Sequence, residues 1–361
     1  MNSNNRRTFL GNIRSTALAA VYPASFLQYK GRWEEQPREI LRPKALHPGA
    51  RVGLVSPASG VYEREELAMA REIAESFGLR VEMGSHAGDR YGFLAGQDQD
   101  RADDFSRMFQ RPDIDAVWAV RGGYGCSRLL PLLDYAAIRA NPKPLIGYSD
   151  ITALHLAIHR LSGLVTFHGP IARQLFSDYT LQAFKKALFQ AEPIGTTAVP
   201  PPFVPREGQT EWENRVVTLC GGQAEGLTTG GNLSLVTATL GTPFEVDTRG
   251  RILFLEEVGE EPYRVDRMLT QLWLSGKLSE AAGVVFGKFS NCGPREYKPG
   301  YSNTLSLEEV LRIRMEPLRI PCLYGLLFGH VRDNATIPLG IRARLDADAR
   351  TFTLLEPAVR S

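Results

Sequence analysis

The chain has 361 residues, enough for two domains with separate cores, and its 43% hydrophobic and 23% charged content is that of an ordinary globular protein. A formal net charge of +2, with no stripe of lysine and arginine interleaved with aromatic residues, gives no electrostatic basis for binding nucleic acid. No apolar run reaches the ~18–20 residues of a bilayer crossing, so we predict no stable membrane span.

The N-terminal residues are typical of an export signal. Arg6 and Arg7 precede Thr8-Phe-Leu10, and a short, weakly hydrophobic segment of small residues follows from Ser15 to Phe26. This pattern suits a twin-arginine signal better than a general secretory one. We therefore expect residues 1–45 to be a signal and disordered lead outside the fold, and the protein to be periplasmic. The alternative is a disordered basic tail on a cytoplasmic protein.

Strand and helix patterns alternate through the first half of the chain. Strands are predicted at 51–56, 79–83, 116–120 and 164–167 and in the run that leads into Ser149, and helices at 63–78, at 98–111 and directly after Ser149. Strands separated by helices predict a parallel, doubly wound sheet whose ligands bind beyond the carboxyl ends of its strands. Both Ser149 and the loop Arg121-Gly-Gly-Tyr-Gly125 fall at such ends.

The composition changes beyond about residue 191, where 199–205 is rich in proline and predicts a linker. After it, the expected elements are a strand at 215–219, turns rich in glycine and threonine, buried strands at 251–255 and 283–286, a helix at 263–274, and paired strands at 341–345 and 351–355. We therefore expect an α/β N-terminal domain at 46–195, a linker at 196–214 and a smaller, β-rich C-terminal domain at 215–361.

The cysteines do not have the spacing of a metal site, and one pair of histidines has only part of such a motif. No Cys-x-x-Cys pair is formed by the four cysteines, which we expect to be isolated buried thiols: Cys126, Cys220, Cys292 and Cys322. His155 and His159 lie one helical turn apart, but no carboxylate follows at motif spacing, so we expect a solvated or helix-packing role. The Gly-x-Gly-x-x-Gly spacing of a dinucleotide site is also absent. We therefore predict no metal and no cofactor.

The segment Pro144-Leu-Ile-Gly-Tyr-Ser-Asp150 carries the strongest signal for chemistry. Ile151, Leu154 and Ile158 follow it at helical spacing. A serine on a sharp strand-to-helix turn projects its hydroxyl above the sheet, and the helix N-terminus offers free backbone N–H groups to a developing oxyanion. Ser149 is therefore a candidate nucleophile.

A base and an acid for this serine are found in the second half of the chain. His330 ends the apolar run 326–330, so we expect its imidazole to lie at the edge of a hydrophobic core, where it could act as a base. Glu256 directly follows an apolar strand, where a strong partner such as an imidazole would offset the cost of burying its charge. We expect the neighbouring carboxylates to form a solvated loop: Glu257, Glu260 and Glu261.

Further residues complete the candidate site. The N–H of Asp150 and one from the Gly122–Gly123 turn are candidate oxyanion donors, because glycine allows close backbone approach. His168 ends a strand on the ligand side of the sheet, where it either lines the site or has a structural role.

The sequence resembles the LD-carboxypeptidases, which are serine peptidases that include muramoyltetrapeptide carboxypeptidases and microcin C self-immunity proteins. The matching segments run in family order from about residue 48 to the end: Val55-Ser-Pro-Ala58, Ala119-Val-Arg-Gly-Gly-Tyr-Gly125, Lys143-Pro-Leu-Ile-Gly-Tyr-Ser-Asp-Ile-Thr-Ala-Leu154, Thr229-Gly-Gly-Asn-Leu233, Phe254-Leu-Glu-Glu257, Tyr263-Arg-Val-Asp-Arg-Met-Leu269 and Gly329-His330. Two features depart from the pattern, namely the export signal and Cys126, where a small or polar residue is expected.

The resemblance implies a triad in which Ser149 is the nucleophile, Glu256 the orienting acid and His330 the base. It implies an oxyanion hole from the backbone of Gly122 or Gly123 and of Asp150. It also implies a flavodoxin-like N-terminal domain, a β-rich C-terminal domain, an active site between them and a homodimer.

The expected function is a metal-free serine carboxypeptidase that cleaves the L,D-peptide bond before a terminal D-alanine of a muropeptide. Arg121 or a backbone nest is the candidate for holding the terminal carboxylate. The alternative enzyme is a serine amidase that hydrolyses aminoacyl- or peptidyl-nucleotide conjugates, as in the self-immunity branch. A periplasmic binding module without turnover is the remaining alternative.

Overall fold

The computed structural model describes residues 39–361. The predicted export motif, with its arginine pair, lies outside the described residues. We expected the fold to begin at residue 46, but the segment before it is already part of the structure. Leu41 N–H donates to the carbonyl oxygen of Gly163 at 2.9 Å, and Ala45 N–H donates to that of Arg360 at 2.8 Å. These backbone bonds join the segment to the interior of the chain at Gly163 and to its C-terminal end at Arg360.

The first sheet confirms the predicted doubly wound architecture. Its strands lie in the order β12 (Ile337–Leu339), β5 (Thr166–His168), β4 (Leu145–Gly147), β3 (Ala116–Ala119), β1 (Arg51–Val55) and β2 (Arg80–Met83). The strands from β1 to β5 are parallel and have the flavodoxin-like order 2-1-3-4-5, whereas β12 is antiparallel to β5. The carboxyl ends of β3, β4 and β5 therefore meet at one edge.

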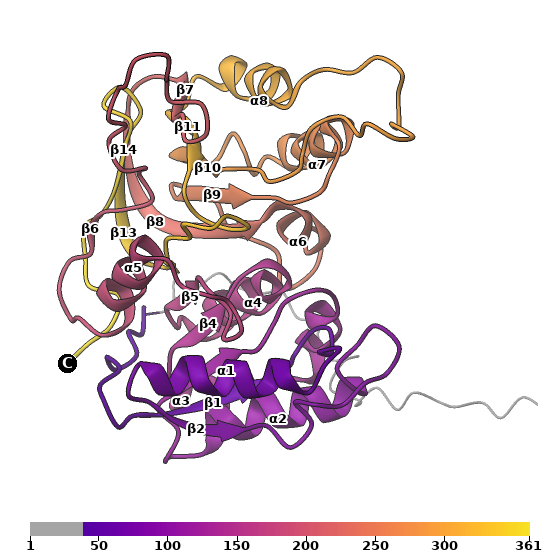
Figure 1. The fold of residues 1–361 in the computed structure, drawn as a ribbon, viewed down its shortest axis with the longest axis vertical. Coiled ribbons are helices and arrows are strands. Elements are labelled where there is room, and N and C mark those ends of the chain that lie inside the picture. Colours follow the sequence, from indigo (N-terminus) through magenta and orange to yellow (C-terminus); the bar gives the residue numbers. More distant parts are fainter. Residues whose placement is uncertain (1–38) are drawn as a thin grey trace, which may run out of the picture. The chain divides into compact units, whose positions relative to one another are not determined.

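Helices cover both faces of this sheet (Figure 1). They are α1 (Glu65–Ser76), α2 (Asp98–Gln110), α3 (Tyr135–Ala140), α4 (Thr152–Ser162) and α5 (Asp178–Leu188). Successive strand residues point to opposite faces, so Trp118 packs into the same core as Phe184 of α5, while Val117 packs with Phe105 of α2. Burial on both faces explains why the central strands β1, β3 and β4 are almost wholly apolar, whereas the edge strand β2 is exposed to half-buried and carries Arg80 and Glu82.

The second sheet is mixed. Its order is β6 (Gly195–Thr196), β14 (Thr351–Leu354), β13 (Arg342–Asp346), β8 (Gln223–Asn232), β9 (Ile252–Glu256), β10 (Gly283–Gly287), β11 (Cys322–Leu326) and β7 (Val217–Cys220). The strands β8, β9, β10 and β11 are parallel to one another, and the outer strands are antiparallel. Three helices accompany it: α6 (Leu233–Ala238), α7 (Pro262–Leu274) and α8 (Leu307–Met315).

The strand β8 corrects one expectation. Its glycines and threonines led us to expect turns after residue 219, but the segment is a ten-residue strand. Glycine is required here by close packing: a Cβ on Gly230 would overlap the carbonyl oxygen of Phe254, and a Cβ on Gly226 would lie 2.5 Å from that of Gly250. The glycines therefore admit the neighbouring segment and do not mark chain reversals.

Chain segments cross between the two sheets. β12 follows β11 in sequence but pairs in the first sheet, while β6 follows α5 and pairs in the second. The end of β8 also contacts the start of α4, because Thr152 Oγ1 accepts a hydrogen bond from Asn232 N–H at 2.9 Å. A Cβ on Gly231 would lie 2.6 Å from Thr152 Oγ1, so glycine permits this contact. The helix after Ser149 is thus fixed to a strand of the second sheet.

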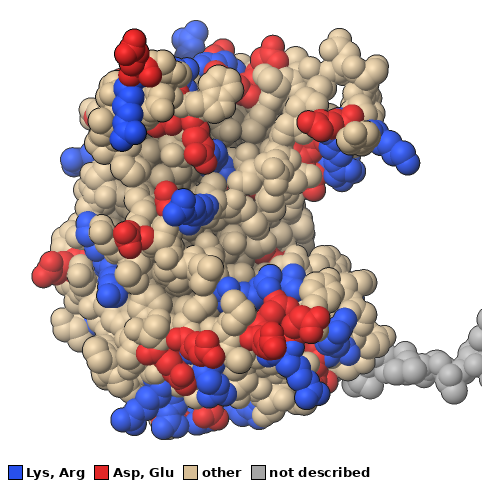
Figure 2. Space-filling view, in the orientation of Figure 1, with Lys and Arg blue, Asp and Glu red and all other residues tan. Residues whose placement is uncertain are grey.

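The surface carries charges of both signs. On the face drawn in Figure 2, basic and acidic side chains lie beside one another, and no stripe of Lys and Arg alone crosses it. Within residues 39–361, none of the helices is long and apolar enough to span a bilayer. All four cysteines are free thiols, and three of them are buried as expected, whereas Cys220 is half-buried.

Candidate active site

Ser149 lies on a tight turn between β4 and α4. Its φ of 64° falls in the left-handed region that serine rarely adopts, and a single 3-10 turn, Ser149–Ile151, begins there. Gly147 makes the turn possible, because a Cβ at this position would lie 2.9 Å from Ile151 Cγ1. A strained serine between a buried strand and a helix has the backbone geometry of a nucleophile elbow.

The glycine loop after β3 lies against this serine. A Cβ on Gly122 would lie 3.0 Å from Ser149 Cβ and 3.3 Å from Ser149 Oγ, so no larger residue fits without displacement. Gly123 adopts a φ of 115°, and Ser59 Oγ accepts the next N–H, that of Tyr124, at 3.1 Å. The structure therefore brings the Gly122 backbone beside Ser149, as the predicted oxyanion site requires.

Asp150 joins the elbow to the same loop. Its buried carboxylate accepts a hydrogen bond from Cys126 N–H at 2.8 Å. Burial raises the pKa of Asp150 and raises that of the Cys126 thiol well above its usual value, so the thiol stays protonated. Arg101 Nη1 donates hydrogen bonds to the carbonyl oxygen of Pro57 and, at 3.2 Å, to that of Gly125 in the glycine loop.

His330 and Glu256 form a hydrogen-bonded pair. The ring Nδ1 lies 2.6 Å from Glu256 Oε2, and the carboxylate is fully buried at the end of β9. Burial alone would raise the pKa of this carboxyl group, but the hydrogen bond and charge of His330 lower it overall. Burial likewise opposes protonation of His330, yet Glu256 raises the pKa of the imidazole overall. The ionised carboxylate therefore fixes Nδ1–H and leaves Nε2 for a second partner.

A short loop presents His330 to its partner. Gly329 has a φ of 93°, and a Cβ there would collide with the Glu256 carboxylate. Gly329 N–H donates to Asn334 Oδ1 at 2.9 Å, and Ser290 Oγ–H donates to the carbonyl oxygen of His330 at 2.5 Å. Glycine and the two polar side chains thus hold the backbone that carries the imidazole.

The structure joins two of the predicted triad residues, His330 and Glu256, and places His330 beside the residue that precedes the third. The His330 ring packs edge-on to Tyr148, with ring centroids 4.8 Å apart, and Tyr148 directly precedes Ser149. Burial, and then the charge of Glu256, raises the pKa of Tyr148 to about 12, so its hydroxyl stays neutral at physiological pH. Tyr148 was missed as a site residue because only its neighbours carried a sequence signal.

Two of the three carboxylates assigned to a solvated loop are in fact buried, so that prediction was wrong for Glu257 and Glu261. Glu257 accepts hydrogen bonds from Asn232 Nδ2 at 3.1 Å and from Ser234 N–H and Oγ–H at 2.8 and 2.6 Å. Burial and the charge of Glu256 raise its pKa. Glu261 accepts from Gly300 N–H at 2.9 Å. Partners distant in sequence compensate this burial, which local composition does not reveal.

The other predicted residues have identifiable contacts. Arg121 donates from Nη1 to the carbonyl oxygen of Gly60 at 2.9 Å, and its guanidinium carbon lies 5.6 Å from the centre of the Tyr62 ring. Its role in holding a terminal carboxylate stays a prediction. His155 and His159 pack in the fold, with ring nitrogens 2.8 Å from the carbonyl oxygen of Gly147 and 3.1 Å from that of Leu164.

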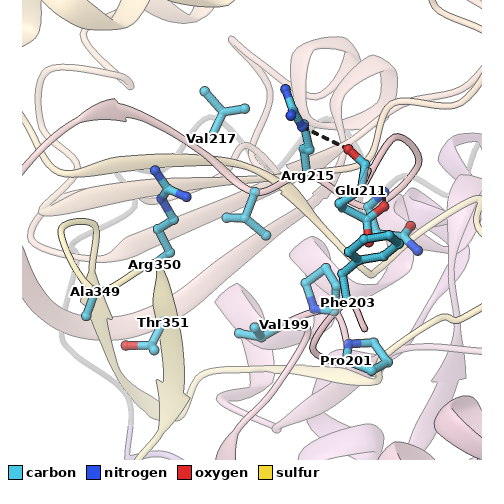
Figure 3. Close-up of a pocket in the computed structure, with 12 residues that line it drawn as sticks. Val199, Pro201, Phe203, Glu211, Arg215, Val217, Ala349, Arg350 and Thr351 are labelled. Atoms are coloured by element: carbon cyan, nitrogen blue, oxygen red, sulfur yellow. Dashed lines mark hydrogen bonds between the residues drawn. The ribbon is translucent and has the colours of Figure 1, made fainter. Parts of the chain in front are cut away.

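A separate surface cavity of about 650 Å³ lies in the second half of the chain (Figure 3). Its lining comes from the proline-rich segment, the residues before β7 and the turn before β14, and includes Phe203, Arg215 and Arg350. Arg215 Nε donates to the carbonyl oxygen of Glu211 at 2.9 Å. None of the triad residues lines this cavity, so we do not assign the chemistry to it.

Comparisons with known proteins decide the family. Residues 52–169 match the LD-carboxypeptidase N-terminal domain, and residues 225–345 match the LD-carboxypeptidase C-terminal domain. The chain belongs to the LD-carboxypeptidase family. We therefore place it among the peptidases, a class of hydrolases.

Individual relatives cover nearly the whole described chain. A probable murein peptide carboxypeptidase of Bacillus subtilis is 40% identical over 320 residues, which are 87% of this chain and 94% of that protein. The muramoyltetrapeptide carboxypeptidase of Oxalobacter formigenes has a TM-score of 0.70 at 30% identity, covering 86% of this chain and 100% of that one. The microcin C7 self-immunity protein MccF, in complex with aspartyl sulfamoyl adenosine, has a TM-score of 0.77 at 27% identity, covering 89% and 100%.

The pair of Glu256 and His330 predicts a specific pH dependence. A histidine base works only when neutral, so hydrolysis is lost as the pH falls through the raised pKa of His330. The acid limb of kcat/KM is therefore expected above the usual imidazole value of about 6.5. Glu256→Gln removes the charge that raises this pKa, so the limb moves to lower pH and kcat/KM falls by roughly 10³- to 10⁴-fold.

The matched control is Glu260→Gln, because Glu260 is half-buried and pairs with Arg264, with 3.5 Å between Oε2 and Nη1. Glu260→Gln should leave the acid limb of kcat/KM unchanged. If the two variants had the same pH profile of kcat/KM, Glu256 would not be the group that raises the pKa of His330.

Proposed function

We propose that this chain is a serine-type LD-carboxypeptidase that removes the terminal D-alanine from peptidoglycan tetrapeptides. The observation that supports the proposal is that the hydrogen-bonded pair of His330 and Glu256 lies against Tyr148, next in the chain to Ser149 on its strained elbow. Names of relatives support the substrate class, because murein peptide and muramoyltetrapeptide carboxypeptidases are among them.

In the proposed mechanism, Nε2 of His330 accepts the proton of Ser149 Oγ as the oxygen attacks the carbonyl carbon before the D-alanine. The negative charge that develops on the carbonyl oxygen is stabilised by backbone N–H groups from the Gly122–Gly123 turn and Asp150. His330 then gives its proton to the leaving amine, which releases D-alanine and leaves an acyl-enzyme on Ser149. Water, activated by the same imidazole, hydrolyses the ester and restores the serine.

Glu256 stays ionised throughout this cycle. Its carboxylate holds Nδ1–H, so the imidazole keeps the tautomer in which Nε2 is free to accept a proton, and it stabilises the imidazolium that forms. The half-exposed Arg121 is the proposed partner of the substrate's terminal carboxylate. Its guanidinium already has one backbone acceptor and retains further N–H donors.

A second candidate function is favoured by the similarity to MccF, which was solved with an aminoacyl sulfamoyl nucleoside. Hydrolysis of an aminoacyl- or peptidyl-nucleotide conjugate would use the same three residues, since the bond cleaved is again an acyl bond. The two functions differ in the groups that the protein must bind on either side of that bond.

The proposal predicts that wild-type protein converts a muropeptide tetrapeptide into a tripeptide and free D-alanine. Ser149→Ala removes the nucleophile and should reduce the rate by several orders of magnitude. Mass spectrometry of the peptide after incubation measures both outcomes. EDTA is included, and we expect it to have no effect because no step uses a metal ion.

The matched control is Ser76→Ala, because Ser76 is an exposed serine at the end of α1 whose Oγ–H donates to the carbonyl oxygen of Ile73 at 2.6 Å. It should retain most of the activity. An intact tetrapeptide with wild-type protein, together with cleavage of an aminoacyl sulfamoyl nucleoside, would replace the first function by the second.

We also propose that the protein is exported through the twin-arginine route, and we keep the homodimer as a prediction from sequence. The arginine pair supports export, so Arg6→Lys with Arg7→Lys should leave the protein in the cytoplasmic fraction while wild type reaches the periplasm. Immunoblots of cell fractions measure this. Equal distribution of the two proteins would contradict the export proposal.

A further inference from the structure

Glu256 has a second histidine on its far side. His168, at the end of β5, is fully buried, and its Nε2 lies 3.8 Å from Glu256 Oε1. The other carboxylate oxygen, Oε2, is the one bound by His330. The carboxylate therefore lies between two imidazoles, of which only one belongs to the proposed triad.

The atoms that face each other across this gap make no hydrogen bond of good geometry. Within residues 39–361, this holds for Glu256 Oε1 and for both ring nitrogens of His168, although the side chain of Asn232 is close enough to Glu256 to help lower the pKa of its carboxyl group. A buried carboxylate oxygen without a donor is costly, and so is a buried imidazole N–H without an acceptor. The two groups are complementary, because a neutral imidazole carries one N–H and an ionised carboxylate only accepts.

The surroundings of His168 favour its neutral form. Burial lowers the pKa of its imidazole to about 4, the charge of Glu256 acting in the opposite direction and that of His330 in the same one. The other titratable groups that face it are His155 of α4, with ring centroids 6.3 Å apart, and Tyr148, at 6.1 Å. The ring of Phe254 in β9 packs against a further side of the His168 ring, with ring centroids 5.5 Å apart. His155 and Tyr148 are themselves neutral at physiological pH, because burial shifts the pKa of each away from ionisation.

We propose that His168 is a positioning residue that donates Nε2–H to Glu256 Oε1 and thereby fixes the carboxylate that orients His330. The inference rests on the proposed serine mechanism and extends it by one residue. The contact must shorten by about 1 Å to reach hydrogen-bond length, and such contacts often tighten when substrate binds. The backbone supports this role, since His168 is paired on both sides, with Gly147 of β4 and Ile337 of β12.

Two polar substitutions separate donation to Glu256 from simple space filling. The amide nitrogen of glutamine reaches the position of Nε2, whereas that of asparagine reaches the position of Nδ1. His168→Gln should therefore keep the donor and stay within about fivefold of wild type, and His168→Asn should lower kcat by roughly 10- to 100-fold with KM little changed. Without the donor the carboxylate leaves His330 for part of the time, so the acid limb of the pH profile moves toward the usual imidazole value of about 6.5.

The matched control is His159→Asn. His159 is another histidine held within the fold, but its ring lies beside Leu164 and Arg251, which are not part of the triad. It should leave both kcat and the acid limb unchanged. Equal loss in His168→Gln and His168→Asn, or an unshifted acid limb in His168→Asn, would show that the imidazole only fills space and would overturn the proposal.

One measurement needs no variant and decides the case if the substitutions unfold the protein. Nitrogen-15 NMR of histidine-labelled wild-type protein reports which ring nitrogen of His168 carries the proton. We expect a neutral ring with the proton on Nε2 between about pH 6 and pH 8, a range that lies above its shifted pKa. A proton on Nδ1, or a charged ring, would overturn the proposal.

The rate at which a fluorophosphonate modifies Ser149 separates this inference from the proposed function. It measures activation of the serine without any peptide substrate. No reaction with wild type would contradict the serine mechanism itself. Reaction with wild type, and equally fast reaction with His168→Asn, would contradict only the role of His168.

Discussion

The site depends on one buried charge. Glu256 is fully buried at the end of a central strand, and an ionised carboxylate there is tolerated only with donors close by. His330 supplies one at 2.6 Å. The imidazole of His168 lies on the other side of the carboxylate. Gly329 leaves room for the carboxylate beside His330, and the loop that follows holds His330 in place. An imidazole held in this way has its free nitrogen directed away from the acid, which is the condition for a base.

The register of β8 and β9 links Glu256 to the segment that carries Ser149. Asn232 of β8 is the register partner of Glu256 in β9. Asn232 N–H also bonds to Thr152, three residues after Ser149. The pairing of β8 with β9 therefore places Glu256 beside the start of α4, the helix that follows Ser149. Residues separated by about a hundred positions in the chain are positioned by backbone pairing and by one side-chain hydrogen bond.

Much of this could be predicted from the sequence, because local rules determined it. Alternating strands and helices predicted the doubly wound sheet, and the elbow at Ser149, the terminated apolar run at His330 and the strand end at Glu256 each had a local pattern. The strand β8 could not be recognised, since its glycines serve contacts with Phe254 and Thr152 that only the fold reveals. The burial of Glu257 was missed for the same reason: Asn232 and Ser234, which bond to it, lie more than twenty positions away. His168 stayed ambiguous because its distance from Glu256 depends on the contact between the two sheets.

Trapping the serine shows whether the His330–Glu256 pair makes Ser149 nucleophilic. Wild-type protein is treated with a fluorophosphonate, digested, and the modified peptide identified by mass spectrometry. We expect a single adduct on Ser149, formed in wild type and nearly absent in His330→Ala. An adduct on a different serine, or modification of Ser149 at the same rate without His330, would contradict activation of Ser149 by the pair.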